Sequence, residues 1–361
     1  MQFKPVFEKK ERPFLIAGPC SAESEQQVLE TARALAAQNI DLFRAGIWKP
    51  RTRPGGFEGA GTEGLHWLRK VKAETGLPVC TEVANTQHVF EALKFGVDVL
   101  WIGARTTVNP FSVQEIANAL EGVDIPVLVK NPVNADFKLW LGAIERIHKA
   151  GIERIAVIHR GFSYHGESRW RNVPRWEFVI ELKRRFPDLQ VICDHSHICG
   201  RRDTLQMVAQ RALDLNYDGL MTEVHQNPDT ALSDAQQQIT PEEYGTLIHQ
   251  LTVRHKTTAD ESSRHSLEQL RHLIDELDEE LFQVLSARMR VAREIGQLKA
   301  RNNIAILQPA RWNEILEKAV DKGKQLELSR TFVETFLRAV HQESIEQQAR
   351  VMVEKEAVRS S

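Results

Sequence analysis

Hydrophobic positions in the first two thirds of the chain form short apolar runs, each followed by a stretch with amphipathic helical periodicity, such as SEQQVLETARALAAQ. The runs are FLIAGPC (14–20), DLFRAGI (41–47), PVCTEV (78–83), VLWIGA (99–104), PVLVKN (126–131), RIAVIHRG (154–161), QVICDHSH (190–197) and GLMTEVH (219–225). Nearly continuous apolar strands are typical of a parallel sheet that is buried on both faces. Eight strand–helix units in about 250 residues predict an α/β fold, a (β/α)8 barrel, with an open doubly wound sheet as the alternative.

The last third of the chain has a purely helical pattern. One periodicity runs from Ser266 to Ala300, which is about 50 Å of helix at 1.5 Å per residue. Its apolar stripe consists of Leu270, Leu277, Leu281, Val284, Val291, Ile295 and Leu298. A second helix is expected near 308–322, ahead of Gly323, and Ser329 can cap a third that extends to about residue 355. Three helices cannot cover so long a stripe, so we expect this all-α domain to dimerise.

The two patterns meet at a shift in composition. Of the 20 glycines, 18 lie before residue 260, and so do 13 of the 14 prolines. The segment VRHKTTADESSRH (253–265) is polar and reads as a linker. The predicted organisation is a barrel over 1–254, a linker over 255–265 and a helical domain over 266–361.

Charge and cysteine content narrow the class of protein. A formal net charge of −2 argues against nucleic acid or an anionic membrane as the main partner. No stretch approaches the roughly 18 consecutive apolar residues that a membrane span needs, and the first residues contain no apolar signal-peptide core. Four cysteines do not form a disulfide framework in a chain this long. A cytoplasmic protein is expected.

Residues that can bind metals or anions concentrate at the carboxyl ends of the predicted strands, where barrel enzymes carry their active sites. They are Cys20, Arg44, Lys49, Glu82, Arg105, Lys130, Arg160, His197 and Glu223, with Asp234 in the loop after the eighth strand. Cys20, His197, Glu223 and Asp234 form a mixed donor set that suits a divalent transition metal. Taken singly, Cys20 or His197 is more often a buried core residue than a ligand.

The second set at the strand ends is cationic and consists of Arg44, Lys49, Arg51, Arg105, Lys130 and Arg160. Converging cations are costly unless they bind anions, and phosphate or carboxylate groups are the usual reason. Neither GxxxxGK[ST] nor GxGxxG occurs, so a nucleotide is not indicated. The pattern therefore predicts a metal-using barrel enzyme that acts on small phosphorylated substrates.

These residues stand in motifs that resemble 3-deoxy-D-arabino-heptulosonate-7-phosphate (DAHP) synthase over most of residues 12–250. The motifs are AGPCS (17–21), FRAG (43–46), KPRT (49–52), TEV (81–83), IGAR (102–105), VKN (129–131), HRG (159–161), DHSH (194–197), EVH (223–225) and ALSDAQQQ (231–238). The KPRT run favours this family over 3-deoxy-D-manno-octulosonate-8-phosphate synthase, which shares the barrel but carries KANRS-type residues there. The resemblance implies condensation of phosphoenolpyruvate with erythrose 4-phosphate.

The resemblance also implies a role for each residue. Cys20, His197, Glu223 and Asp234 match the metal ligands, with manganese expected and iron, cobalt or zinc as alternatives. The residues matched to phosphoenolpyruvate are Arg105, Lys130 and Arg160 at its phosphate and Arg44 and Lys49 at its carboxylate. Arg51 and Thr52 match contacts to erythrose 4-phosphate, and Lys49 and Glu82 are candidate proton handlers. Two positions depart from the family: His195 replaces a familiar proline, and His159 replaces a frequent glutamate.

Polar residues interrupt the apolar faces of the helical domain. Arg288 and Lys299 are 11 residues apart on the first helix, about three turns, and so point the same way. Ser344 and Gln348 interrupt the third helix. A single polar residue there usually sets coiled-coil register. Several together indicate a polar pocket, because unpaired buried charge is expensive.

These helices resemble the all-helical chorismate mutase family from LEQLRHLIDELDEELFQVLSARM through REIGQLKA to ESIEQQA. Its active-site positions fall on Arg271, Arg288, Lys299, Arg311, Ser344 and Gln348. The resemblance implies rearrangement of chorismate to prephenate without metal or nucleophile, with Lys299 and Gln348 stabilising charge on the ether oxygen. Arg271 lies about 25 Å from Arg288 along one helix, so it is expected to serve the site of a partner chain.

One stretch of the helical domain departs from this family. QPARW (308–312) stands where D-P-x-R-E is common, so Gln308 can bond the substrate hydroxyl but Trp312 cannot replace a carboxylate. Three hypotheses remain open: two working enzymes in one homo-oligomer, a dimer or a tetramer; a helical domain that chiefly senses prephenate or chorismate and inhibits the barrel; or a pure dimerisation module.

Overall fold

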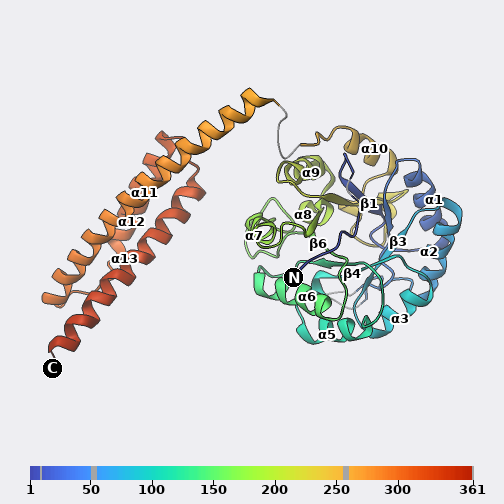
Figure 1. The fold of residues 1–361 in the computed structure, drawn as a ribbon, viewed down its shortest axis with the longest axis horizontal. Coiled ribbons are helices and arrows are strands. Elements are labelled where there is room, and N and C mark those ends of the chain that lie inside the picture. The colour runs from blue at the N-terminus through green and yellow to red at the C-terminus, as the bar shows by residue number, and fades with distance from the viewer. Residues whose placement is uncertain (9, 50–54, 255–259, 360–361) are drawn as a thin grey trace. The chain divides into compact units, whose positions relative to one another are not determined.

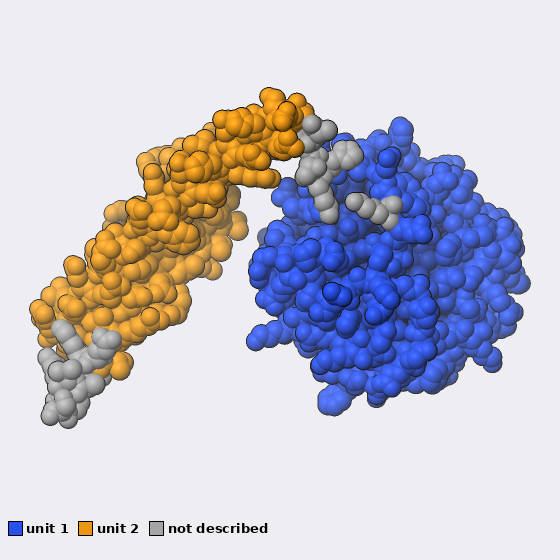
Figure 2. Space-filling model, viewed as in Figure 1, with its two compact units in different colours: residues 1–256 blue, residues 257–361 orange. Residues whose placement is uncertain are grey.

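The computed structural model describes residues 1–8, 10–49, 55–254 and 260–359. The chain divides into two compact units, Met1–Lys256 and Thr257–Ser361, which are coloured separately in Figure 2. Each unit is described by itself below. No helix in the described parts of the chain combines the length and the apolar character that crossing a bilayer requires.

Eight parallel strands close on themselves in the first unit (Figure 1). They are β1 (Phe14–Gly18), β2 (Leu42–Arg44), β3 (Val79–Val83), β4 (Val99–Ile102), β5 (Val127–Lys130), β6 (Ile155–His159), β7 (Gln190–Asp194) and β8 (Gly219–Glu223). Each strand pairs with its neighbour in sequence, and β1 pairs with β8. The predicted barrel is confirmed, and an open sheet is excluded because the first and last strands are hydrogen-bonded to each other.

Helices connect the strands and cover the outside of the barrel (Figure 1). They are α1 (Glu25–Ala36), α2 (Thr62–Thr75), α3 (Thr86–Lys94), α4 (Ala104–Thr107), α5 (Pro110–Ala119), α6 (Phe137–Lys149), α7 (Glu177–Arg185), α8 (His195–Cys199), α9 (Leu205–Asp214) and α10 (Pro241–His249). Three 3-10 turns are η1 (Arg202–Thr204), η2 (Pro228–Thr230) and η3 (Ala235–Gln237). Asn85, Asp136 and Thr240 accept backbone N–H bonds at helix starts, which satisfies donors that a helix leaves open.

The barrel unit has two cores because successive side chains of a strand point to opposite faces. The larger core lies between strands and helices. The smaller core fills the barrel interior, and every strand contributes to it: Ile16, Leu42, Cys80, Val99, Trp101, Leu128, Ala156, Ile158, Ile192 and Met221. Phe7 joins this inner core, and its backbone bonds to the Gln190 side chain at the start of β7. The N-terminal segment therefore plugs the amino end of the barrel, which leaves the carboxyl end for chemistry.

Over residues 260–359, the described part of the second unit, the chain forms three helices, α11 (Glu261–Arg301), α12 (Pro309–Gln325) and α13 (Arg330–Arg359). α11 begins before the expected Ser266 because the Asp260 side chain accepts the Ser263 N–H and caps it. Gly323 was expected to end α12 but lies inside it, where an added Cβ would stand 2.5 Å from Val333 Cγ2. This glycine serves packing against α13. Ser329 caps α13 as predicted, by accepting the Phe332 N–H.

Candidate active sites

Strand alternation explains how charged residues reach the carboxyl end of the barrel. In six strands an inner-core residue is followed two positions later by a charged one, which must face the same way. The six charged residues are Arg44, Glu82, Lys130, Arg160, Asp194 and Glu223. The apolar interior thus ends in a ring of charge at the mouth of the barrel.

Three of the four predicted metal ligands lie together at this mouth. One donor atom from each of Cys20, Glu223 and Asp234 lies within 4.8 Å of the other two. Cys20 follows β1 and Glu223 ends β8, and the pairing of Gly18 with Glu223 brings these chain segments side by side. Asp234 has a φ of 48°, a left-handed conformation that is uncommon outside glycine, and its Oδ2 lies 3.5 Å from the Cys20 Sγ.

His197, the fourth predicted ligand, lies beside these three donors. Its Nε2 is 3.7 Å from the Asp234 Oδ2, so the imidazole and the Cys20 thiol approach the same carboxylate oxygen. Its Nδ1 lies 2.9 Å from Asp194 Oδ2. Asp194 also accepts the His197 backbone N–H. A carboxylate that holds one ring nitrogen and turns the other toward the ligand cluster is a common arrangement around metal-binding histidines.

The donor set fits a divalent transition metal. Burial raises the pKa of the Cys20 thiol to about 12, with the neighbouring Glu223 carboxylate adding to the rise. Glu223 Oε1 is fully buried and accepts no hydrogen bond from the described residues. A thiol, an imidazole and two carboxylates lie close together here, and this mixture of sulfur, nitrogen and oxygen donors suits a divalent transition metal.

Two cations flank this cluster. Lys49 Nζ lies 3.0 Å from Cys20 Sγ and donates to the Cys20 carbonyl at 2.9 Å. Arg44 Nη2 lies 3.1 Å from Glu223 Oε1 in an ion pair that is almost entirely buried. The guanidinium lies over the Trp101 ring, 5.0 Å from its centroid, and its Nε and Nη1 are buried without a hydrogen bond to the described residues. Unpaired guanidinium N–H groups at a barrel mouth favour an anionic ligand.

Lys130 and Arg160 extend the cationic side of the mouth. Lys130 Nζ pairs with Asp194 Oδ2 at 2.8 Å, and burial lowers the pKa of Arg160 to about 10. Arg160 donates to Asn172, whose amide donates to the His197 carbonyl. Arg105 is exposed in α4 and close enough to Arg160 to contribute to its lowered pKa. Lys130 and Arg160 are thus linked to His197 through Asp194 and Asn172.

The three other predicted residues of the barrel site have different outcomes. Glu82 Oε2 accepts the Trp101 indole N–H at 2.9 Å, and Glu82 interacts electrostatically with Lys49. Arg51 and Thr52, predicted to contact erythrose 4-phosphate, lie outside the described residues.

Sequence reasoning missed several residues that organise this site. Asp194 joins Lys130 to His197, and Arg171 donates to Asp234 and Gln237. Gln237 in turn donates to Glu223 Oε2 at 2.6 Å. Asp194 could have been found from strand alternation, because it follows the inner-core residue Ile192 by two positions. Arg171 belongs to a loop between β6 and α7, and no local pattern marked it.

The two histidines that depart from the family pattern are buried in the barrel unit. His195 bonds to the Leu205 carbonyl and the Thr222 hydroxyl. His159 points into the helix layer, where its Nδ1 bonds to the Tyr217 hydroxyl at 2.9 Å and aromatic rings surround it. Burial lowers the pKa of His159 to about 3, so the ring is neutral. Both side chains are therefore part of the packing.

The helical unit brings four of its predicted residues together. Arg288 hydrogen-bonds to the Ser344 hydroxyl, which joins α11 to α13. Gln348 lies one turn further along α13, and its Oε1 is buried without a partner in the described part of the unit. Lys299 donates to the Ile306 carbonyl at 2.6 Å, and burial lowers its pKa. A polar site therefore lies between α11 and α13 near the start of α12.

Three other predicted residues of the helical unit are exposed. Arg271 lies on α11, 17 positions before Arg288, and Gln308 precedes α12. Arg311 pairs with Glu314 on its own helix at 2.6 Å. Within one chain these residues do not complete the site that Arg288, Ser344 and Gln348 begin.

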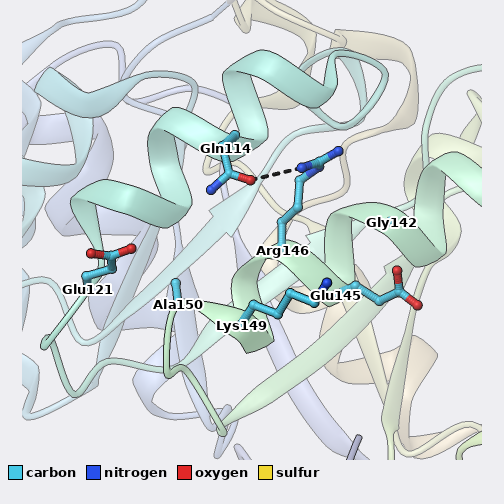
Figure 3. Close-up of a pocket in the computed structure, with 7 residues that line it drawn as sticks. All are labelled: Gln114, Glu121, Gly142, Glu145, Arg146, Lys149 and Ala150. Carbon is cyan, nitrogen blue, oxygen red and sulfur yellow. Dashed lines mark hydrogen bonds between the residues drawn. The ribbon is translucent and has the colours of Figure 1, made fainter.

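A separate cavity of about 280 Å³ lies on the outside of the barrel, between α5 and α6 (Figure 3). It is lined by Gln114, Glu121, Gly142, Glu145, Arg146, Lys149 and Ala150, and Arg146 donates to Gln114 across it. The end of α6 leads into the start of β6, so this cavity lies toward the amino end of the barrel. It is remote from the charged mouth.

The fold and the barrel site define a class of protein: a (β/α)8 barrel with Cys20, Glu223 and Asp234 clustered among charged residues at its mouth, followed by a helical unit with its own cationic residues. The chain belongs to the DAHP synthetase I family, whose model matches residues 5–258. A second model, chorismate mutase type II, matches residues 270–349. The chain thus carries two enzyme domains of aromatic amino acid biosynthesis.

Known proteins with similar sequences include a heptonate aldolase and octonate aldolases. The phospho-2-dehydro-3-deoxyheptonate aldolase of Thermotoga maritima is 31% identical over 237 residues, which is 66% of this chain and 68% of that protein. Its crystal structure superposes with a TM-score of 0.60 and covers 65% of this chain and 67% of that one. A 2-dehydro-3-deoxyphosphooctonate aldolase of Alkalilimnicola ehrlichii is 30% identical over 243 residues, and the match covers 62% of this chain and 84% of that protein.

Proposed function

We propose that the barrel unit condenses phosphoenolpyruvate with erythrose 4-phosphate to give DAHP and phosphate, and that the helical unit converts chorismate to prephenate. One observation carries the first half: donor atoms of Cys20, Glu223 and Asp234 lie within 4.8 Å of one another, directly beside Arg44 and Lys49. This arrangement suits a substrate that presents an anionic group and a polarisable carbonyl to the same mouth.

In the barrel, the chain's own side chains bind and orient the two substrates. Arg44, two nitrogens of which have no hydrogen bond to the described residues, and Lys49 are assigned to the carboxylate of phosphoenolpyruvate. Arg105, Lys130 and Arg160 are assigned to its phosphate. Arg51 and Thr52 are assigned to erythrose 4-phosphate. Lys49 Nζ and the Glu82 carboxylate are the groups proposed to move protons during addition of water and loss of phosphate.

Cys20, His197, Glu223 and Asp234 are proposed to hold a divalent metal, with manganese preferred and iron, cobalt or zinc as alternatives. When bound, such an ion supplies Lewis-acid polarisation of the aldehyde carbonyl. The cytoplasm is the proposed location, because all four cysteines are free thiols and a reducing compartment keeps them so.

In the helical unit, Arg288, Ser344 and Arg311 are assigned to the carboxylates of chorismate, and Gln308 to its hydroxyl. Lys299 and Gln348 would stabilise the charge that grows on the breaking ether oxygen. Arg271 is proposed to act in the site of a second copy of the chain. The exposed apolar stripe of α11 supports such a dimer, because Leu277, Val284 and Leu298 are each at least 60% exposed.

Two substitutions test the assignment of the reactions to their sites. Cys20→Ala should reduce DAHP synthesis at least a hundredfold and leave chorismate consumption within twofold of the parent. Lys299→Ala should do the reverse, because removing a preorganised charge that faces a developing anion costs about 10²–10³ in rate. Both activities are measured on the same preparations. Loss of both activities in either variant, or of neither, would contradict the assignment.

A regulatory role for the helical unit is the second candidate. Trp312 supports this regulatory role, because it stands where a carboxylate is common in the mutase family. A site altered in this way can bind a ligand without converting it rapidly. We expect prephenate or chorismate to inhibit DAHP synthesis, with Arg288→Ala abolishing the inhibition and sparing the barrel activity. The measurement is the rate of DAHP synthesis across a prephenate titration. Unchanged rates at saturating prephenate would eliminate this role.

A further inference from the structure

Trp312 and His341 form a stacked pair in the helical unit. Their ring centroids are 4.1 Å apart and the rings are inclined by only 16°. Trp312 lies in the first turn of α12, and His341 lies on α13. The pair therefore fixes the imidazole against a second helix, at the position where related mutases carry a carboxylate in place of Trp312.

His341 shares a helix face with two residues of the mutase site. Ser344 and Gln348 follow it by three and seven positions, a spacing that lies along one side of a helix. Two polar atoms on this face are buried and lack a hydrogen-bond partner among the described residues, namely His341 Nε2 and Gln348 Oε1. Buried polar groups in folded proteins are nearly always satisfied, so unsatisfied ones in a candidate site indicate a ligand.

The charge state of His341 narrows the kind of group that it can bind. Burial lowers the pKa of His341, and the nearby positive charges of Arg288 and Lys299 lower it further. At neutral pH the ring is therefore uncharged and offers Nε2 as one neutral donor or acceptor. A neutral ring suits a hydroxyl group, whereas the surrounding cations suit carboxylates.

We propose that His341, held in place by Trp312, binds the ring hydroxyl of chorismate through Nε2 and thereby replaces the missing carboxylate. Chorismate has two carboxylates, an ether oxygen and one hydroxyl, and the residues assigned above account for the charged and ether groups. The hydroxyl can donate one hydrogen bond and accept another, so His341 would share it with Gln308. The inference rests on the proposed mutase function and names a further specificity-determining residue of that site. Trp312 acts as its positioning residue.

The test compares chorismate with an analogue that lacks the ring hydroxyl, in the full chain and in His341→Phe. The phenyl ring keeps the stack on Trp312 but cannot hydrogen-bond. We expect kcat/KM for chorismate to fall about tenfold in the variant, as for loss of a hydrogen bond to a bound substrate, and kcat/KM for the analogue to change less than twofold. Trp312→Ala should lose the same discrimination, and Trp312→Phe should keep it.

Controls separate recognition from folding. Gln342→Phe places the same side chain on the exposed neighbouring position and should change neither substrate's kcat/KM. His341→Asn retains a neutral hydrogen-bonding group and should recover part of the discrimination. Far-UV circular dichroism and DAHP synthesis should match the parent in every variant.

The outcomes that contradict the proposals are distinct. Equal losses of kcat/KM for chorismate and the analogue in His341→Phe would overturn the role of His341 and leave the mutase function standing. A parent chain that does not consume chorismate would defeat the mutase function and this inference together.

Discussion

Arg44 and Glu223 form an ion pair in which both side chains are at most 1% exposed. Removing two charges from water costs several kcal/mol per ion, and replacing a buried pair by apolar residues is often stabilising. Two Arg44 nitrogens also lack hydrogen bonds to the described residues. At the scale of the residue, a buried ion pair of this kind contributes little net stability to the fold. This supports the assignment of Arg44 and Glu223 to ligand binding.

His159 provides a prediction about stability and pH. Its pKa is about 3 in the fold because of burial, against about 6.5 in an unfolded chain. Between pH 3 and pH 6.5 the unfolded state therefore binds more protons than the folded state. The free energy of unfolding falls as the pH decreases through this range, by at most about 1.4 kcal/mol per pH unit. We expect His159→Gln, which cannot titrate, to reduce the loss of unfolding free energy between pH 7 and 5 by about 2 kcal/mol.

Urea unfolding of the full chain, followed by tryptophan fluorescence, measures this difference, since six of the seven tryptophans lie in the barrel unit. His249→Gln, at an exposed position on the last turn of α10, is the control for replacing one histidine by glutamine. Identical slopes for His159→Gln and the parent would contradict the prediction.

At the scale of the element, the close approach of α11 and α13 shapes the mutase site. Gly296 is buried, and a Cβ added there would stand 2.9 Å from the Gln348 Cα. Real Cβ atoms essentially never come so close to backbone, so only glycine allows this helix spacing. The glycine therefore sets the distance between Lys299 on one helix and Gln348 on the other.

Gly296→Ala should push the two helices apart by a few tenths of an ångström and displace Gln348. We expect mutase kcat to fall at least tenfold while DAHP synthesis is unchanged, because small misplacements of catalytic groups are costly. Gly142→Ala on α6 is the control: it has open space around its added Cβ and should be neutral or slightly stabilising. Full mutase activity in Gly296→Ala would refute the link between helix spacing and catalysis.

At the scale of the whole molecule, the helical unit leaves much of its apolar surface uncovered. The stripe on α11 includes Leu270, Leu277, Leu281, Val284 and Val291, each at least 43% exposed. A contiguous apolar stripe along one long helix is typical of an interface, and a second copy would cover it and deliver Arg271 to the opposite site.

Leu277→Glu tests this interface. A buried unpaired carboxylate is costly, so the variant should show half the parent's mass in analytical ultracentrifugation and lose mutase activity at least a hundredfold. DAHP synthesis should persist at saturating substrate. Gln283→Glu adds the same charge outside the stripe and should alter neither property. If Leu277→Glu has the same mass as the parent, dimerisation through the apolar stripe of α11 is excluded.

The sequence by itself determined the elements and the two families. Apolar runs and helical periodicities are local, so all eight strands and three C-terminal helices could be predicted from them. Motifs such as DHSH and KPRT indicate the family, because each places the residues typical of that chemistry within a few adjacent positions. The predicted start of the first of these helices at Ser266 and the predicted end of the second before Gly323 were wrong, because a cap and a close helix contact decided them.

Only the tertiary structure decided which side chains meet. Gly18 pairs with Glu223 across more than 200 residues, and this register brings the Cys20 thiol beside the Glu223 and Asp234 carboxylates. No local pattern contains such a contact, because it arises when the barrel closes. The same is true of Asp194 between Lys130 and His197, and of His341 stacked on Trp312. Periodicity assigns a side chain to a face, and packing selects its partner.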